Sequence, residues 1–167
     1  MIEIFDEVLN DLDSFTYDQA ISKLQWSYVP QPVTPPLINN HWYASGENFI
    51  DDLFEDLLDA TELKGLDSLK SSYLLAHTHG LEQQAHYDSC DFTMLYYPKL
   101  DWKPEWGGGT LIGDTLVQYK PNQLVMFSCD QLHQGQPISK QCFELRPLVV
   151  FQCLADSAMV ERLSWQK

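Results

Sequence analysis

The second half of the chain, from Leu69 onward, is a succession of short apolar and aromatic segments separated by glycine, proline, asparagine and aspartate. Residues 71–76 and 92–97 are typical segments, because aliphatic and aromatic side chains dominate them. Runs of this length and composition predict β-strands. Short strands joined by frequent turns are typical of an antiparallel jelly roll, so we expect a mainly β fold in this half.

The first half has apolar residues at helical spacing instead. This spacing predicts helices over residues 4–12 and 17–24, with Ser14 or Thr16 as the cap of the second helix. A group of prolines then interrupts the pattern and predicts a loop or an edge strand. These prolines are Pro30, Pro32, Pro35 and Pro36.

A third helix is predicted to begin at Ser45 or Asn48 and to end near Leu58. Its acidic residues are expected to form a solvated face, with a docking role for a partner as the alternative. We therefore expect one domain over residues 1–167, in which a helical layer (residues 1–65) precedes the β core (residues 66–157). The acidic residues are Glu47, Asp51, Asp52, Glu55, Asp56 and Asp59.

Composition is consistent with a single packed core. The chain has 167 residues, of which 44% are hydrophobic and 13% aromatic, and a chain of this length buries about 70% of its unfolded surface. The net charge of −14 argues against nucleic acid or an anionic membrane as a partner, because phosphate groups repel such a field. No apolar run of about 18 residues occurs, and the N-terminus lacks the features of a secretion signal, so we expect a cytoplasmic protein.

The four cysteines show no Cys-x-x-Cys pairing and lie in strand-like surroundings. We therefore interpret them as buried thiols, rather than as zinc ligands or a disulfide framework. They are Cys90, Cys129, Cys142 and Cys153.

One group of polar residues in the β half has the chemistry of a metal site. In an extended segment His86 and Asp88 point to the same face, and Tyr87 points away. With the downstream His133 they offer two imidazoles and one carboxylate, which suit ferrous iron and leave coordination positions open. Arg146 adds a planar, permanently charged group that matches the carboxylate of a dicarboxylic acid.

The order of these residues and of the motifs around them resembles the prolyl 4-hydroxylase-type iron(II)/2-oxoglutarate-dependent oxygenases, especially the short phage and bacterial members. The resemblance covers residues 70–154. Pro147 departs from the family pattern, since proline cannot donate to a β ladder and normally lies at an edge or bulge. The motifs are His86-x-Asp88, residues 93–98, Asp101-Trp102, Trp106-Gly107-Gly108-Gly109-Thr110-Leu111, residues 121–127, His133-x-x-x-Pro137 and Arg146.

This resemblance implies a double-stranded β-helix, the cupin-like jelly roll, with the N-terminal helices packed along one sheet. It makes His86, Asp88 and His133 the iron ligands. Arg146 then binds the distal carboxylate of 2-oxoglutarate with help from Tyr97, although alternation alone leaves open whether Tyr96 or Tyr97 faces the pocket. The implied cofactor and cosubstrates are iron(II), 2-oxoglutarate and dioxygen, with L-ascorbate as an associated reductant.

The resemblance further implies hydroxylation with release of succinate and carbon dioxide. A pocket rimmed by Tyr87, Trp102 and Trp106 could stack on a pyrrolidine ring, so a prolyl residue of a peptide or protein is the first expectation. The alternatives are a free amino acid or another small metabolite as substrate, and a non-catalytic cupin-like metal-binding module. Oligomeric state is not predicted.

Overall fold

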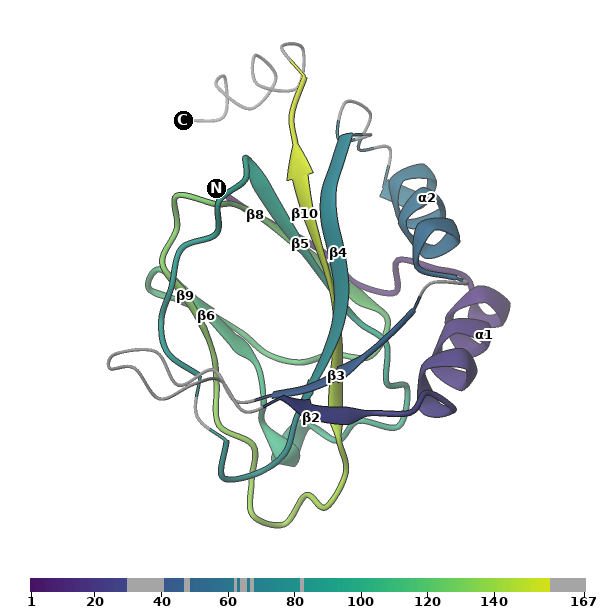
Figure 1. Cartoon of the computed structure of the whole chain (residues 1–167), viewed down its shortest axis with the longest axis vertical. Coiled ribbons are helices and arrows are strands. Elements are labelled where there is room, and N and C mark those ends of the chain that lie inside the picture. Colours follow the sequence, from purple (N-terminus) through teal and green to yellow (C-terminus); the bar gives the residue numbers. More distant parts are fainter. Residues whose placement is uncertain are drawn as a thin grey trace.

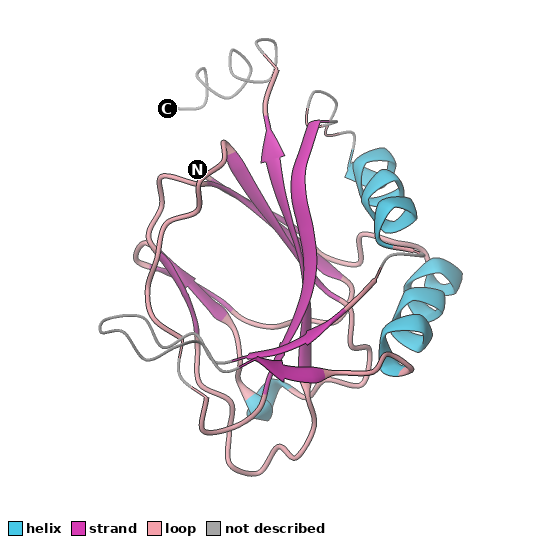
Figure 2. Ribbon diagram, in the orientation of Figure 1, coloured by secondary structure: helices cyan, strands magenta, loops and turns pink. Residues whose placement is uncertain are grey.

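The computed structural model describes residues 1–29, 41–46, 49–61, 63, 66, 68–81 and 83–156. In this part of the chain the strands form two antiparallel sheets (Figure 2). The prolines predicted to form a loop or edge strand, and Asn48, lie outside it. The elements are β1 (Ile2–Phe5), α1 (Asp11–Ser22), β2 (Ser27–Val29), β3 (His41–Ala44), α2 (Ile50–Thr61), β4 (Ser68–His77), β5 (Phe92–Tyr97), the 3-10 helix η1 (Pro104–Trp106), β6 (Thr110–Ile112), β7 (Thr115–Val117), β8 (Gln123–Ser128), β9 (His133–Gly135) and β10 (Arg146–Leu154).

The large sheet has seven strands in the order β1-β8-β5-β10-β4-β3-β2, and the small sheet has three in the order β7-β6-β9. Helices α1 and α2 lie beside the large sheet, on the side away from β6 and β9 (Figure 1). Side-chain alternation divides the large sheet into two apolar faces: Met94 and Val149 pack in the cluster that contains the helices, and Leu95 and Val150 pack with Ile112 of the small sheet. The architecture is a double-stranded β-helix with N-terminal helices, as predicted.

The helix predicted over residues 4–12 is wrong. Residues Ile2–Phe5 form β1, which pairs with the far end of the β half, because Ile2 is opposite Phe127 in β8. A partner strand this distant in the sequence overrides the local helical spacing. The predicted helical layer of residues 1–65 therefore also contributes strands to the large sheet.

Helix α1 begins earlier than the helix predicted over residues 17–24 and contains most of it. Its cap is Asn10, whose side chain accepts hydrogen bonds from the backbone N–H groups of Leu12 and Asp13. Neither Ser14 nor Thr16 is the cap. An asparagine at this position satisfies backbone donors that the first helical turn leaves without partners.

Helix α2 has a clear apolar stripe. Leu53 and Leu57 are fully buried against the large sheet, and the ring of Phe54 lies 5.1 Å from that of Phe151 in β10. Asp56 is not simply solvated, since it accepts a 2.6 Å hydrogen bond from the Tyr17 hydroxyl of α1. No described helix is long and apolar enough to cross a membrane.

Pro147 lies in β10, which has a strand on each side in the large sheet. It is opposite Ala76 of β4, but the pairing of β10 with β5 starts only at Val149. The proline therefore occupies the part of β10 that has a strand on one side only, where a missing N–H donor is tolerated.

The interpretation of all four cysteines as free thiols is corrected by the structure. Cys90 and Cys129 form a disulfide, while Cys142 and Cys153 are free and buried as predicted. The two bonded residues flank the start of β5 and the end of β8, where Phe92 is opposite Ser128. Strand pairing brings them together across 39 positions, a proximity that spacing rules for nearby cysteines do not reveal.

Candidate functional site

His86, Asp88 and His133 converge between the two sheets. The backbones of His86 and His133 exchange two hydrogen bonds, each 3.0 Å long, in an isolated antiparallel bridge. Nε2 of His133 lies 3.5 Å from Oδ2 of Asp88, and Nε2 of His86 lies 3.9 Å from Oδ1. The three ligand atoms all lie within 4.8 Å of one another, so one ion can contact all of them.

Both imidazoles present the same nitrogen to the centre of this group. Nδ1 of His86 lies 3.0 Å from the carbonyl oxygen of Gln84, and Nδ1 of His133 lies 3.2 Å from that of Gln131. A ring that donates from Nδ1 keeps a lone pair at Nε2, which is the form that binds metals. Burial, followed by the neighbouring His86, lowers the pKa of His133 and so favours this neutral form.

Asp88 is held by a buried hydroxyl. The side chain of Thr93 in β5 donates a 2.5 Å hydrogen bond to Oδ2 of Asp88. The same hydroxyl lies 3.3 Å from the sulfur of Cys129 and 3.5 Å from that of Cys90. The disulfide thus packs directly behind the group that orients the carboxylate.

Arg146 is fully buried, and its guanidinium is only partly satisfied. Nη1 donates to the backbone carbonyl oxygens of Gly108 and Gly109. Nε and Nη2 have no hydrogen-bond partner. Burial lowers the pKa of this group. Buried donors without an acceptor are costly, so these two N–H groups indicate a ligand rich in acceptors.

Gly108 allows the arginine to lie this close to the backbone. Its φ is +74°, and a Cβ there would lie 2.8 Å from Cδ of Arg146. Any other residue at this position would be strained and would push the guanidinium away. The run of glycines in the sequence therefore serves the arginine and is more than a flexible turn.

Tyr97, not Tyr96, faces the space between the sheets. Its hydroxyl lies 2.8 Å from that of Thr110, and burial raises its pKa. Tyr96 lies on the helix side, where its hydroxyl donates to the side chain of Asn122 at 3.2 Å. Among the two candidates from the sequence, only Tyr97 shares the Arg146 side of the sheet.

A small cavity of about 40 Å³ lies beside the three candidate ligands. Thr110 and Gly135 of the small sheet form part of its wall, and so does Gln83 of the segment before His86. Its other lining residues are Tyr73, Leu75, His86, Asp88, Thr93, Leu95, His133, Leu148 and Val150.

The aromatic residues predicted to rim a substrate pocket do not line this cavity. Trp102 is 4% exposed, donates from Nε1 to the carbonyl of Gly107 and packs against Tyr119, so it belongs to the core beside Arg146. Trp106 packs edge-on against Trp102, while Tyr87 is 63% exposed.

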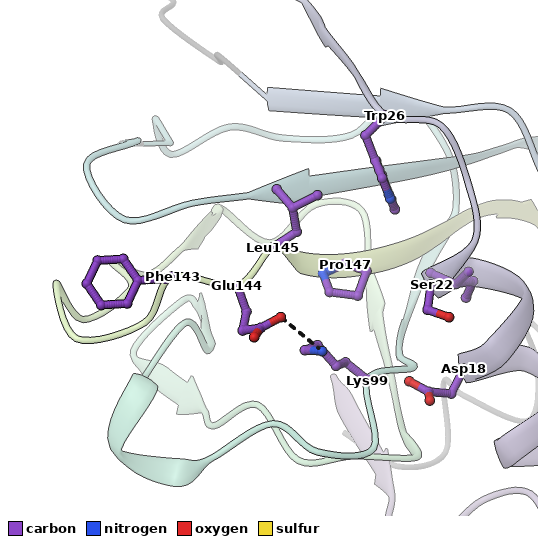
Figure 3. A pocket seen from close by; sticks show the side chains of 9 residues that line it. Asp18, Ser22, Trp26, Lys99, Phe143, Glu144, Leu145 and Pro147 are labelled. Carbon is purple, nitrogen blue, oxygen red and sulfur yellow. Dashed lines mark ion pairs between the residues drawn. The ribbon is translucent and has the colours of Figure 1, made fainter.

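A larger groove of about 350 Å³ lies elsewhere, between α1 and the segment that precedes β10. Figure 3 shows the amino group of Lys99 beside Glu144; Trp26 and Pro147 also line the groove. Lys99 pairs with Asp101 at 2.8 Å and with Glu144 at 3.5 Å. This groove contains none of the predicted site residues.

Three further residues of the site escaped the sequence analysis: Thr93, Gln83 and His77. Alternation along residues 71–77 offered one signal, because His77 falls on the same face as Leu75. Thr93 had the same kind of signal, because it falls on the same face of its strand as Tyr97. Gln83 had none, since its contacts depend on the path of a loop.

Neither protein-family models nor curated protein sequences match this chain. Solved structures do. A prolyl hydroxylase from Trichoplax adhaerens, in complex with a peptide fragment of the hypoxia inducible factor oxygen degradation domain, is 16% identical over 96% of this chain and 86% of its own, with a TM-score of 0.67.

Two other structures show the same likeness. The viral collagen prolyl hydroxylase of Paramecium bursaria chlorella virus 1, in a 2-oxoglutarate complex, is 17% identical over 93% of this chain and 96% of its own (TM-score 0.57). HygX from Streptomyces hygroscopicus, with nickel and 2-oxoglutarate bound, is 13% identical over 93% and 83% (TM-score 0.61). At these identities the likeness shows a shared fold.

Proposed function

We propose that this protein is an iron(II)- and 2-oxoglutarate-dependent oxygenase. Two complementary features carry the proposal: two imidazoles and one carboxylate line one cavity, and a buried arginine with two unused donors lies behind Gly135 of the wall of that cavity. Solved structures of the same fold that hold 2-oxoglutarate support it.

The donor set fits iron(II). Two imidazoles with free Nε2 atoms and a single carboxylate are the ligands that non-haem iron oxygenases use, and they leave positions for other ligands. Asp88 and His133 have side chains only 7% exposed, which limits water around the ion. The hydroxyl of Thr93 orients the carboxylate, and this kind of support raises metal affinity.

Arg146 fits the distal carboxylate of 2-oxoglutarate. Its Nε and Nη2 atoms lie along one edge of the guanidinium and can donate two parallel hydrogen bonds to a carboxylate. The carbonyl oxygens of Gly108 and Gly109 hold the opposite edge, so the group does not need to reorganise on binding. The hydroxyl of Tyr97 can donate a further hydrogen bond to the same carboxylate.

When bound, iron(II) with 2-oxoglutarate and dioxygen supplies the oxidising chemistry that hydroxylates a carbon–hydrogen bond and releases succinate and carbon dioxide. The chain's own residues fix geometry. His86, Asp88 and His133 would hold the ion, and Arg146 would hold the distal carboxylate of the cosubstrate. The apolar wall, with Leu95, excludes water.

The test measures iron binding and succinate formation in the wild type and in three variants, His86→Ala, Asp88→Ala and His133→Ala. We expect the wild type to bind iron(II) and to form succinate, and each variant to lose iron-dependent turnover while it keeps its circular dichroism spectrum. Near-normal turnover in His133→Ala would show that the distal ligand is wrongly assigned. Iron binding without succinate formation would indicate a non-catalytic metal-binding module.

For the substrate, we propose a prolyl residue of a peptide or protein. Support comes from the prolyl hydroxylase of the same fold that was solved with a peptide fragment bound. A net charge of −14 makes polyanionic substrates unfavourable. Incubation with a proline-rich peptide library should add one oxygen to proline, as read by mass spectrometry. If only free amino acids stimulated succinate formation, the proposed peptide substrate would be wrong and a small-molecule substrate would take its place.

A further inference from the structure

The side chain of Gln83 fills the space above Gly135. A Cβ at Gly135 would overlap the amide oxygen of Gln83 and would lie 3.6 Å from Nη2 of Arg146. The glutamine amide and the unused edge of the guanidinium therefore border the same small volume. Gln83 and Gly135 also line the cavity beside the three candidate ligands.

His77 holds this amide from the other side. Nε2 of His77 lies 2.7 Å from Nε2 of Gln83, so the amide nitrogen donates and the ring accepts. His77 is 4% exposed and is opposite Arg146 in the pairing of β4 with β10. Burial, then the charges of Arg146 and His41, lowers its pKa to about 2, which keeps the ring neutral and able to accept.

The backbone of Gln83 is fixed relative to the candidate ligands. Its carbonyl oxygen accepts a 2.5 Å hydrogen bond from the side chain of Gln134, the residue after His133. Three residues further along, His86 forms its backbone bridge to His133. The side chain is therefore held at both ends, by Gln134 at the backbone and by His77 at the amide.

We propose that Gln83, positioned by His77, is a specificity-determining residue of the cosubstrate pocket, where it limits the charge and length of the dicarboxylic acid that Arg146 binds. This inference rests on the proposed function. A neutral amide beside the guanidinium tolerates an incoming carboxylate, whereas a second carboxylate at position 83 would repel it. The amide also occupies volume next to Gly135 that a longer acid would need.

The charge role is tested with Gln83→Glu, which changes one group and keeps the shape. Binding of 2-oxoglutarate to manganese(II)-loaded protein is measured by calorimetry without dioxygen. We expect at least about tenfold weaker binding of 2-oxoglutarate, because a like charge close to its carboxylate opposes binding, and unchanged manganese affinity. The matched control is Gln141→Glu at an exposed position, which should bind like the wild type.

Two outcomes separate this inference from the proposed function. If the wild type binds manganese but no 2-oxoglutarate, the proposed function fails, and the inference fails with it. If the wild type binds 2-oxoglutarate and Gln83→Glu binds it within about twofold, a difference below that of one hydrogen bond, only the role of Gln83 is overturned.

The length role is tested with Gln83→Ala and the longer acid 2-oxoadipate. The affinity for 2-oxoadipate relative to 2-oxoglutarate should rise by at least about fivefold, the effect of roughly one kcal/mol. An unchanged ratio would overturn the role of Gln83 in length selection.

The positioning role of His77 is tested with a pair of substitutions. His77→Leu removes the acceptor for the Gln83 amide, and His77→Gln keeps one. We expect His77→Leu to weaken 2-oxoglutarate binding by about three- to tenfold, the range of one hydrogen bond, and His77→Gln to retain most of it. Manganese affinity should be unchanged in both. Equal losses in the two variants would contradict a positioning role.

Discussion

Thr93 connects a candidate ligand to the core of the large sheet. It is fully buried, and its hydroxyl is the donor that holds Oδ2 of Asp88 at 2.5 Å. Orientation of this kind is commonly worth 10- to 100-fold in metal affinity, and we expect roughly that loss in Thr93→Val. Titration with manganese(II) measures it. Thr93→Ser keeps the hydroxyl and should stay near the wild type; equal losses in both variants would point to packing instead.

Arg146 binds the backbone with one edge of its guanidinium and leaves the other edge for a ligand, which the single amino group of a lysine cannot do. Its Nη1 is occupied by the carbonyl oxygens of Gly108 and Gly109, which leaves Nε and Nη2 for a ligand. We expect Arg146→Lys to weaken 2-oxoglutarate binding by about 1.5–3 kcal/mol, the range for a hydrogen bond to a charged group. Manganese affinity should change little. An unchanged Michaelis constant for 2-oxoglutarate would reassign the role to another cation.

At the level of the elements, the Cys90–Cys129 disulfide links the segment that carries Asp88 to the end of β8, just before His133. A cross-link restricts the unfolded chain, and for a loop of 39 positions the expected contribution is on the order of 2–4 kcal/mol. Denaturation with and without a dithiol reductant should show this loss in the wild type. The double variant Cys90→Ala/Cys129→Ala should not respond to the reductant, and a response there would implicate other sulfur chemistry.

The strands of the β half could be predicted because their signals are local. In residues 92–97 the side chains alone specify a strand, and the His-x-Asp spacing puts both side chains of the motif on one face of an extended segment. The convergence of His133 on that pair was expected from resemblance, since nothing local indicates its backbone bridge to His86.

Predictions failed where distant segments decide the outcome. Strand β1 forms because it pairs with β8, although the residues of β1 have helical spacing. Cys90 meets Cys129 only because β5 pairs with β8. Gln83 fills the space above position 135 because that residue has no side chain, and a glycine in a sequence does not show which residue occupies that space.

For the whole molecule, His77 makes stability depend on pH. Its pKa is about 2 in the folded protein, because the ring is buried, and about 6.5 when unfolded. Below about pH 6.5 the His77 ring takes up a proton in the unfolded chain but not in the folded protein. The free energy of unfolding therefore decreases as the pH is lowered, by up to about 1.4 kcal/mol per pH unit. His77→Gln should show a shallower decline in denaturation series between pH 7 and 5. If the free energy of unfolding declined equally with pH in the wild type and in His77→Gln, His77 would be protonated in the folded protein without loss of stability.

The paired backbones of His86 and His133 have a kinetic consequence. Each histidine's amide proton is bonded to the other's carbonyl oxygen, so neither can exchange with solvent until the bridge opens. One opening event then releases both protons and separates both imidazoles. A metal ion bound to both rings would suppress that event, so the deuterium uptake of two amides far apart in the sequence would measure how long the ion stays bound.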